Sequence, residues 1–303
     1  MDRLEAMALL LSVTELGSLS AAGRKLGMPL ATVSRKLSEL EAHLKVRLLN
    51  RSTRRLALTD AGRDYVAACR RILDDVDEAE RAAAGEYRAP RGHLTITAPI
   101  VFGRLHVLPI AIEFMREHPQ VDVRLALGDG IANLLEERVD IAVRIGVLPD
   151  SSLLATRVGT IRRVVCASPG YLAAHGVPAT PADLGAHRCV TFDALMAADA
   201  WVFRVGGAEQ LVPIHTRLSV NTAEAAIDAA NAGVGLTRVL SYQVDAAVRA
   251  GQLTVVLEDA EPAPIPVSLV YTGALRLPLK TRAFLDFAAP RLRERVAAGV
   301  VVS

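Results

Sequence analysis

Apolar and polar positions alternate with the period of an α-helix over residues 4–44. In the first helix the apolar positions are Leu4, Met7, Ala8 and Leu11. Gly17 is suited to end this helix, and Ser18 to cap a short second one over 19–26. Gly27 closes the second helix, and Pro29 fits the first turn of a third. The third helix has one apolar stripe, at Val33, Leu37, Leu40 and Leu44. Two helices joined by a glycine-containing turn predict a helix-turn-helix.

Basic residues dominate the segment after the third helix, where Lys45, Arg47, Arg51, Arg54 and Arg55 occur. No acidic residue is found from 42 to 59. Alternation around Leu56 and Leu58 predicts a short hairpin, which would be the wing of a winged helix-turn-helix. A solvated basic loop is the alternative, but a basic segment directly after a helix-turn-helix favours the wing.

A long helix is predicted next, from about 60 to 87, with Thr59 as its cap. At about 1.5 Å per residue it would extend over about 40 Å. Its apolar residues are spaced alternately by four and three positions, at Tyr65, Cys69, Ile72, Val76, Ala79 and Ala83. These residues form one apolar line along the helix, a seam, which predicts pairing with another helix, as in a dimer. The alternative is a stripe that packs against the helix's own domain.

The pattern changes to alternating strands and helices after a linker at 89–92. Strands are predicted at 93–99, 121–127, 140–146, 162–168, 218–220, 253–257 and 267–272. Helices are predicted at about 101–118, 131–137 and 280–297, and a further helix is expected to start after Asn221 and Thr222. Strand–helix–strand alternation implies parallel strands with right-handed crossovers.

These patterns divide the chain into a winged helix-turn-helix over 1–59, a linker and dimerisation helix over 60–88, and a two-lobed α/β domain over 89–303. The first lobe is expected to comprise 92–160 and 267–303, and the second 161–266. A strand after Pro266 would return the chain to the first lobe, so that two crossings form a hinge. Ligands of such folds bind in a cleft at the C-terminal ends of the strands.

The charge distribution points to nucleic acid at the N-terminus. The net charge of +2 is too small to indicate this by itself. However, residues 1–60 hold ten Lys and Arg against six Asp and Glu, whereas residues 89–303 hold twenty of each. A local positive excess is what a phosphate-binding face requires.

The cysteines, Cys69, Cys166 and Cys189, are too sparse and odd in number for a disulfide framework. This fits a reducing cytoplasm. A redox-sensing pair is the alternative, although no neighbouring residue is suited to activate a thiolate. No segment approaches the roughly 18 apolar residues of a membrane span. Asp2 and Glu5 stand where a signal peptide is basic. The sequence therefore predicts a cytoplasmic protein with neither a membrane partner nor a cofactor.

Candidate DNA contacts lie on the third helix and in the wing, because a helix fits the major groove and reads base edges from its outward face. The outward residues near the helix start are Leu30, Ala31, Thr32, Ser34 and Arg35. Arg35 is suited to a bidentate contact with guanine, and Thr32 to the methyl group of thymine. The other candidates are Ser18 before the second helix and Arg51, Ser52, Thr53 and Arg54 in the wing. For Thr32 and Ser34 the alternative is an ordinary solvent-facing position.

Candidate contacts for a small-molecule effector lie at strand ends in both lobes. Thr97 ends the first strand of the α/β domain, and Asn221 and Thr222 repeat this arrangement in the second lobe. A helix that starts at such a point offers free N–H groups to an anion. The candidates are Thr97, Pro99, Ile100, Arg144, Asn221 and Thr222, with Arg144 as a fixed positive charge. The alternative for both strand ends is ordinary helix capping.

The stretch ELGSLSAAGRKLGMPLATVSRKLSELEAHLKVRLLNRSTRRLALTDAG, residues 15–62, resembles the N-terminal domain of LysR-type transcriptional regulators. GHLTITAP, VDIAVRIG, SPGYLAAHG and AGVGL are similar to the effector domain of the same family, so the resemblance covers nearly the whole chain. It implies a periplasmic-binding-protein-like effector domain with ligand contacts at the strand ends. It also implies binding to double-stranded promoter DNA, a homodimer that assembles into a homotetramer as a dimer of dimers, and RNA polymerase as a further partner.

Two positions depart from the family pattern. Met28, Pro29 and Leu30 stand where many members have Ser-Gln or Ser-Pro, so base preference does not carry over. Thr237 and Arg238 follow AGVGL where many members have a Leu-Pro pair.

Two other classes were weighed. An α/β enzyme would need a nucleophile elbow, a metal-ligand cluster or a phosphate loop, and the sequence has none of these motifs. An exported solute-binding protein would have no use for the basic helical N-terminus.

Overall fold

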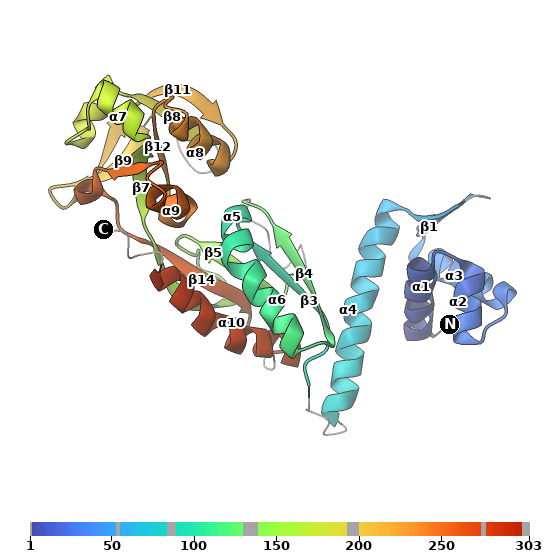
Figure 1. Ribbon diagram of the computed structural model, residues 1–303. Helices are drawn as coiled ribbons and strands as arrows, with labels where there is room; N and C mark the ends of the chain where they lie inside the picture. Colours follow the sequence, from blue (N-terminus) through green and yellow to red (C-terminus); the bar gives the residue numbers. More distant parts are fainter. Residues whose placement is uncertain are drawn as a thin grey trace. The chain divides into compact units, whose positions relative to one another are not determined.

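The computed structural model describes residues 2–52, 55–83, 89–129, 139–192, 200–273 and 277–298. Within them the chain forms two compact units, Met1–His93 and Leu94–Ser303 (Figure 1). Each unit is considered by itself.

Helices and a hairpin build the first unit. Its elements are α1 (Arg3–Leu16), α2 (Leu19–Leu26), α3 (Leu30–Leu44), β1 (Leu49–Ser52), β2 (Arg55–Leu58) and α4 (Asp60–Ala83). The Asp2 carboxylate starts α1 by accepting a hydrogen bond from the N–H of Leu4 at 2.9 Å. Gly17, with φ +61°, ends this helix in the left-handed region that favours glycine. The bounds of α2 are those that the sequence predicted.

The core of the first unit lies between α1, α3 and the beginning of α4. It contains Leu9, Leu10, Val13, Val33, Leu37, Leu40 and Cys69, all with at most 1% of their surface exposed. Tyr65 packs against this cluster. The prediction of a seam for a second helix was therefore wrong for Tyr65 and Cys69, because α1 already covers this part of α4. Ile72 and Val76 are half-buried and lie outside the cluster.

The first lobe of the second unit is a five-stranded sheet in the order β4-β3-β5-β14-β6. Its elements are β3 (Gly92–Ala98), α5 (Ile100–Phe102), α6 (Leu108–Glu117), β4 (Val121–Leu127), β5 (Ile141–Ile145), β6 (Leu153–Ile161), β14 (Ile265–Thr272) and α10 (Leu279–Ala298). α6 and α10 lie beside this sheet (Figure 1). They meet through Phe114 and Phe284, whose ring centroids are 5.1 Å apart.

The second lobe is another five-stranded sheet, in the order β11-β8-β12-β7-β13, with a separate β9–β10 hairpin. Its strands are β7 (Arg163–Ala167), β8 (Arg188–Phe192), β9 (Ala200–Val205), β10 (Ala208–Pro213), β11 (His215–Val220), β12 (Leu236–Leu240) and β13 (Thr254–Val256). Its helices are α7 (Pro169–His175), α8 (Ala223–Asn231) and α9 (Ser241–Arg249), with 3₁₀ turns at Pro181–Ala186 and Glu258–Ala260.

The chain crosses between the lobes twice. Arg162 lies at the first crossing, between β6 and β7, and the segment from Glu258 to the start of β14 forms the second. An ion pair ties the crossings together: the Arg162 guanidinium lies 2.7 Å from a carboxylate oxygen of Glu258 and 2.7 Å from one of Glu261. These hydrogen bonds, with Glu261 as the larger cause, raise the pKa of Arg162.

The strand directions differ from the parallel arrangement that the sequence predicted. β3 and β5 are parallel, but β14 runs antiparallel to both β5 and β6. In the second lobe, β7 runs antiparallel to β12 and β13. The reason is the hinge: a strand that arrives from the other lobe needs no helical crossover, and so can enter a sheet in either direction.

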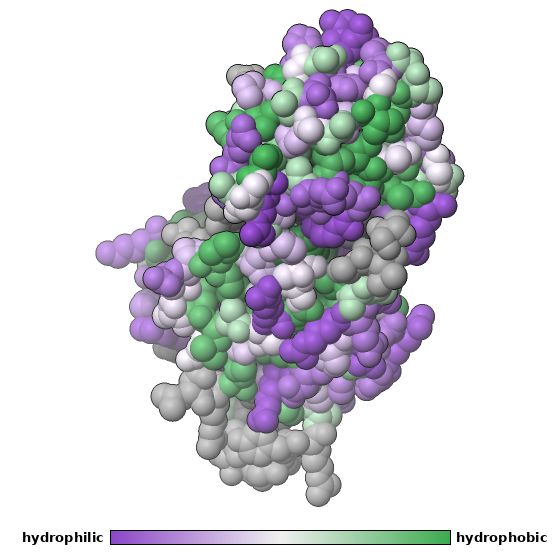
Figure 2. Space-filling model, turned by 90° about the vertical axis from the view of Figure 1, so that its left-hand side faces the viewer, coloured by the Kyte–Doolittle hydropathy of each residue, from purple (hydrophilic) through white to green (hydrophobic). Residues whose placement is uncertain are grey.

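The helix expected at 101–118 begins at Ile100 and contains a π-helical turn, Gly103–Val107, between α5 and α6. The helix expected at 131–137 lies outside the described residues. None of the described helices combines the length and apolar character needed to cross a membrane. In Figure 2, hydrophobic and hydrophilic residues are interspersed on the displayed face.

Candidate DNA interface and effector cleft

The turn between α2 and α3 holds the two helices at a fixed angle. The Ser18 hydroxyl caps α2 by accepting a hydrogen bond from the N–H of Ala21 at 3.3 Å. At the other end Gly27 has φ +65°, and the N–H of Met28 donates to the Gly23 carbonyl at 2.8 Å. A Cβ on Gly23 would lie 2.7 Å from the Met28 oxygen, so only glycine permits this turn. Ser18 is therefore a capping residue here, and its expected DNA contact stays a prediction.

The α3 residues expected to contact DNA lie on the face opposite the core. Leu30, Ala31 and Arg35 are exposed, whereas Thr32 and Ser34 are half-buried. The Arg35 guanidinium forms an ion pair with Glu39 one turn later, at 2.7 Å, and 65% of its side chain is exposed. Arg35 would have to leave Glu39 to reach a base.

The predicted hairpin is present as the antiparallel pair β1–β2, in which Ser52 is opposite Arg55. Thr53 and Arg54, at its tip, lie outside the described residues. Arg51 and Ser52 belong to β1, and only their backbone is described. A hairpin directly after α3 is the winged form of the helix-turn-helix.

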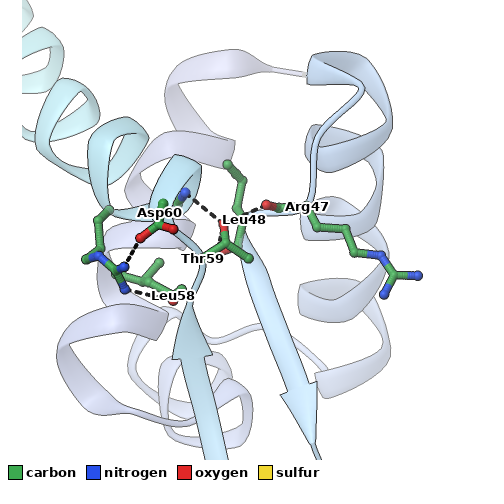
Figure 3. Close-up of polar contacts among 7 residues, drawn as sticks. Arg47, Leu48, Leu58, Thr59 and Asp60 are labelled. Atoms are coloured by element: carbon green, nitrogen blue, oxygen red, sulfur yellow. Dashed lines mark hydrogen bonds and ion pairs between the residues drawn. The ribbon is translucent and has the colours of Figure 1, made fainter.

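Two polar side chains fix the base of the hairpin. The Glu41 carboxylate of α3 accepts hydrogen bonds from the N–H groups of Leu48 and Leu49, at 2.8 and 3.0 Å. The Thr59 hydroxyl donates to the Arg47 carbonyl at 2.7 Å and accepts from the N–H of Gly62 at 2.9 Å (Figure 3). Thr59 is thus the expected helix cap and also a clamp on the hairpin.

Close packing supports the same junction. A Cβ on Gly62 would lie 2.1 Å from the Leu48 carbonyl oxygen. Arg63 donates to the Leu58 carbonyl at 3.1 Å and pairs with Asp60 (Figure 3). The Arg47 side chain extends away from this junction in Figure 3 and is exposed. The hairpin is therefore held between α3 and α4.

Glu41 lies in the stretch that resembles the family, but its role at the hairpin was not predicted from the sequence. A usable signal was present, however. Glu41 is an acidic residue in the last turn of a helix, where the helix dipole disfavours negative charge. Such a residue is expected to have a compensating partner, here the two amides of the hairpin.

In the first lobe the predicted effector residues lie around the end of β3. Thr97 is buried, with 5% of its surface exposed, and Ile100 is 38% exposed. The N–H of Ile100 donates to the Asp129 carboxylate at 3.0 Å. The first amide of this helix is therefore already bonded to a carboxylate of the chain, with which an anionic effector would compete, and the expected effector contact stays a prediction. Asp129 is the residue that sequence reasoning missed, although the turn residues Gly128 and Asp129 after a strand were a signal.

In the second lobe Asn221 is exposed and Thr222 caps α8. The Thr222 hydroxyl accepts a hydrogen bond from the N–H of Ala225 at 3.2 Å. This is the helix capping that the sequence offered as the alternative to a ligand contact. Its own proton remains able to donate to a ligand. Arg144 lies one residue before the end of β5, is half-buried, and faces Ser268 of β14 in the sheet register.

Tyr242 connects the two helix starts. It belongs to α9 of the second lobe, but it packs in the core of the first lobe, where its ring centroid is 5.3 Å from that of Phe102. Burial raises the pKa of Tyr242, and the charges of Asp129 and Glu224 raise it further. Asp129 bonds the first amide of α5 and Glu224 lies in the first turn of α8. α9 contacts both α5 and α8, which sequence reasoning did not show.

The departure from the family pattern after AGVGL has a structural role. The Thr237 hydroxyl donates to the Val190 carbonyl at 3.1 Å. Arg238 is 4% exposed, donates to the Val202 carbonyl at 2.7 Å, and lies 5.4 Å from the ring centroid of Trp201. Burial, together with the nearby charge of Arg163, lowers the pKa of Arg238 to about 9. Both side chains therefore belong to the interior of the second lobe.

All three cysteines are free and buried. Burial raises the pKa of the Cys69 thiol to about 11 and the pKa values of Cys166 and Cys189 to about 12. Thiols with such pKa values are protonated at neutral pH and unreactive.

Comparison with known proteins identifies both units. Residues 4–63 match the family of bacterial regulatory helix-turn-helix proteins of the LysR type, and residues 88–293 match the LysR substrate binding domain. An HTH-type transcriptional repressor of Pseudomonas aeruginosa is 35% identical over 95% of this chain and 91% of its own. The HTH-type transcriptional activator AaeR of Escherichia coli is 32% identical over 94% of this chain and 93% of its own.

Solved structures agree. CrgA, a LysR-type transcriptional regulator from Neisseria meningitidis, is 31% identical, with a TM-score of 0.61 over 95% of this chain and 98% of its own. The Vibrio cholerae virulence activator AphB is 27% identical, with a TM-score of 0.60 over 94% and 98%. The expected fold class, a winged helix-turn-helix, a long helix and a two-lobed α/β effector domain, is thereby confirmed, and the relatives are regulators rather than enzymes. The chain belongs to the LysR family of DNA-binding transcriptional regulators, with an effector-binding domain.

Proposed function

We propose that α3 enters the major groove through Leu30, Ala31, Thr32, Ser34 and Arg35, with the hairpin beside it on phosphate or in the minor groove. The observation that carries this proposal is the junction at Glu41 and Thr59, which joins the basic hairpin rigidly to α3. Such a junction lets one bound element position the other. Ser18, Arg51, Ser52, Thr53 and Arg54 are the further proposed contacts.

Promoter binding by the full-length protein tests this proposal. Arg35→Ala should weaken the cognate site by about 1–3 kcal/mol and relax its specificity, because one bidentate base contact is lost. Arg54→Ala should weaken all sequences alike and reduce the salt dependence by about one phosphate contact. Equal loss on cognate and random DNA in Arg35→Ala would remove Arg35 from the base-reading set.

A dimer through α4 is the second part of the proposal. Ile72 and Val76 are half-buried and outside the core of their own unit, so they are placed to pack against a second copy. The seam begins at Ile72 because α1 covers the earlier positions. Ile72→Asp with Val76→Asp would bury charge in such an interface. Light scattering that showed the variant with the same mass as the parent protein would contradict it. Assembly of two dimers into a tetramer, contact with RNA polymerase and action in the cytoplasm are expected from the family.

The third part concerns the effector, a small molecule bound at the strand ends of both lobes. We expect it to contact Thr97, Pro99, Ile100, Arg144, Asn221 and Thr222. The support is that α9 contacts both α5 of the first lobe and α8 of the second, so the two helix starts lie on either side of one element. A ligand held by both lobes favours the form it binds better, and only by that difference in affinity.

A thermal-shift screen of metabolites on the parent protein, Thr97→Val and Arg144→Ala tests the effector site. At about 100 times its dissociation constant a ligand should stabilise the parent protein by about 2.7 kcal/mol. Thr97→Val keeps the shape and removes a hydroxyl, so it should reduce the shift without changing DNA affinity in the absence of ligand. A ligand that stabilised all three proteins equally would bind elsewhere.

A further inference from the structure

A cavity of about 310 Å³ lies where α5 and the π-helical turn of the first lobe meet α9 and the end of α10. The aromatic and charged side chains that line it are Phe102, His106, Tyr242, Asp245, Arg249 and Arg295. None of the predicted effector residues lines it. Its volume is that of a small-metabolite site.

Aromatic rings form one wall. The ring centroids of Phe102 and His106 are 4.6 Å apart, and that of Tyr242 is 5.6 Å from His106 in an edge-on arrangement. Ile161 and Val296 add aliphatic surface. This wall is suited to an apolar group.

Polar atoms without partners also occur at the cavity. Among the described residues, neither ring nitrogen of His106 has a hydrogen-bond partner, and both are buried. One oxygen of the Asp245 carboxylate is bonded to Arg249 at 2.8 Å, while Oδ1 is buried and has no partner in the described part of the chain. Buried polar groups are normally satisfied, so a ligand or ordered water toward which the His106 and Asp245 side chains turn would supply the partners that these atoms lack.

Arg295 supplies a positive charge that has no carboxylate of the described residues within hydrogen-bonding distance. Its nearest carboxylate in the described residues is that of Glu113, at 3.9 Å, beyond hydrogen-bonding distance. Burial lowers the pKa of His106 to about 4, and the charge of Arg295 lowers it while that of Asp245 raises it. Arg295 and Asp245 thus both lie near a neutral His106.

We propose that this cavity binds a second small molecule, an α-hydroxy or α-amino carboxylate with an apolar side chain. The carboxylate pairs with Arg295, and the adjacent hydroxyl or amino group donates to Oδ1 of Asp245. The side chain packs on the rings of Phe102 and Tyr242. His106, being neutral, completes the site as one donor and one acceptor.

The site goes beyond the proposed effector cleft, and its position gives it a regulatory consequence. Ile161 is the last residue before the first crossing, and α9 follows the strand β12 of the second lobe. A ligand here contacts both lobes next to the hinge. It therefore favours one lobe arrangement whether or not the strand-end site is occupied, and it can be coupled to that site through the lobe arrangement.

Calorimetric titration of the full-length protein with phenyllactate tests the proposal. Phenylpropanoate lacks the hydroxyl, phenyllactamide lacks the charge, and phenylalanine carries an amino group instead. Arg295→Ala should weaken phenyllactate about tenfold or more, because a charge-assisted bond is lost. The matched control is Arg293→Ala, an exposed position on the same helix with the same charge change, which should leave affinity unchanged. Asp245→Ala removes the acceptor of the ligand hydroxyl and should abolish the advantage of phenyllactate over phenylpropanoate.

Two further variants separate the outcomes. Ala246→Trp fills the cavity and should abolish binding, whereas Thr97→Val alters only the strand-end site and should leave it intact. Loss in Thr97→Val with retention in Arg295→Ala would overturn the cavity proposal while supporting the effector cleft. Failure of both phenyllactate and phenylalanine to bind at up to about 20 mM, far above the dissociation constants of ordinary metabolite sites, would overturn it outright.

Discussion

Replacing Glu41 by alanine should detach the hairpin from α3. The carboxylate accepts from the N–H groups of Leu48 and Leu49, at 2.8 and 3.0 Å, in a half-buried setting. Removing it leaves two backbone donors without that acceptor, and bonds to charged groups are the stronger kind, so the expected cost is about 2–3 kcal/mol. Hydrogen exchange followed by mass spectrometry should show lost protection in residues 45–60, and promoter affinity should fall.

Glu39→Ala is the matched control. It removes the same charge from the same helix, but Glu39 is exposed and its carboxylate pairs with Arg35 on the helix surface, away from the hairpin amides. Electrostatics alone predicts tighter DNA binding in both variants, because each loses one negative charge. Positioning of the hairpin predicts that Glu41→Ala weakens binding while Glu39→Ala does not. Equal tightening in both variants would refute the positioning argument.

Other predictions follow from single sites. Gly62→Ala should destabilise the first unit by about 1–3 kcal/mol, because the added Cβ overpacks its surroundings. In the control Gly170→Ala the added Cβ meets nothing within 4 Å, so stability should not change. Melting curves of Gly62→Ala equal to those of the parent protein would contradict the steric argument. The pKa of His106 is lowered from 6.5 to about 4, so the unfolded state binds the extra proton between these values. The urea midpoint of Trp201 fluorescence should therefore fall as pH drops through that window, and less steeply in His106→Phe. Arg162→Met should free the two crossings, which X-ray scattering would register as a wider range of lobe separations; an unchanged profile would count against a hinge clamp.

The short helices of the first unit could be predicted because their limits are set by neighbouring residues. Ser18 caps α2 and Gly27 ends it, and each acts within four residues. The hairpin likewise followed from alternation around Leu56. Local capping and turn chemistry were sufficient here because the winged helix-turn-helix uses standard geometry at each of these ends.

The parts that sequence reasoning missed depend on contacts between distant residues. The amide of Ile100 is bonded by Asp129, 29 positions later. Cys69 continues the apolar spacing of α4, but its partner is α1, which periodicity cannot reveal. The spacing of apolar residues shows that one face of a helix is buried, but which element buries it depends on the tertiary fold.

Tyr242 illustrates how this limit bears on regulation. It follows β12 of the second lobe, yet its ring packs on Phe102 in the first, and burial, with the charges of Asp129 and Glu224, raises the pKa of its hydroxyl. Tyr242 thus lines the cavity, and α9, which carries it, contacts both α5 and α8, where the proposed strand-end contacts lie. Any ligand that shifts the ring in one site changes the surface offered at the other. Coupling between two binding sites is reciprocal. If a ligand in the cavity strengthens binding at the strand-end cleft, a ligand in the cleft therefore strengthens binding in the cavity by the same factor. Tyr242→Leu would keep an apolar side chain but remove the shared polar end, so it should bring the coupling factor toward one.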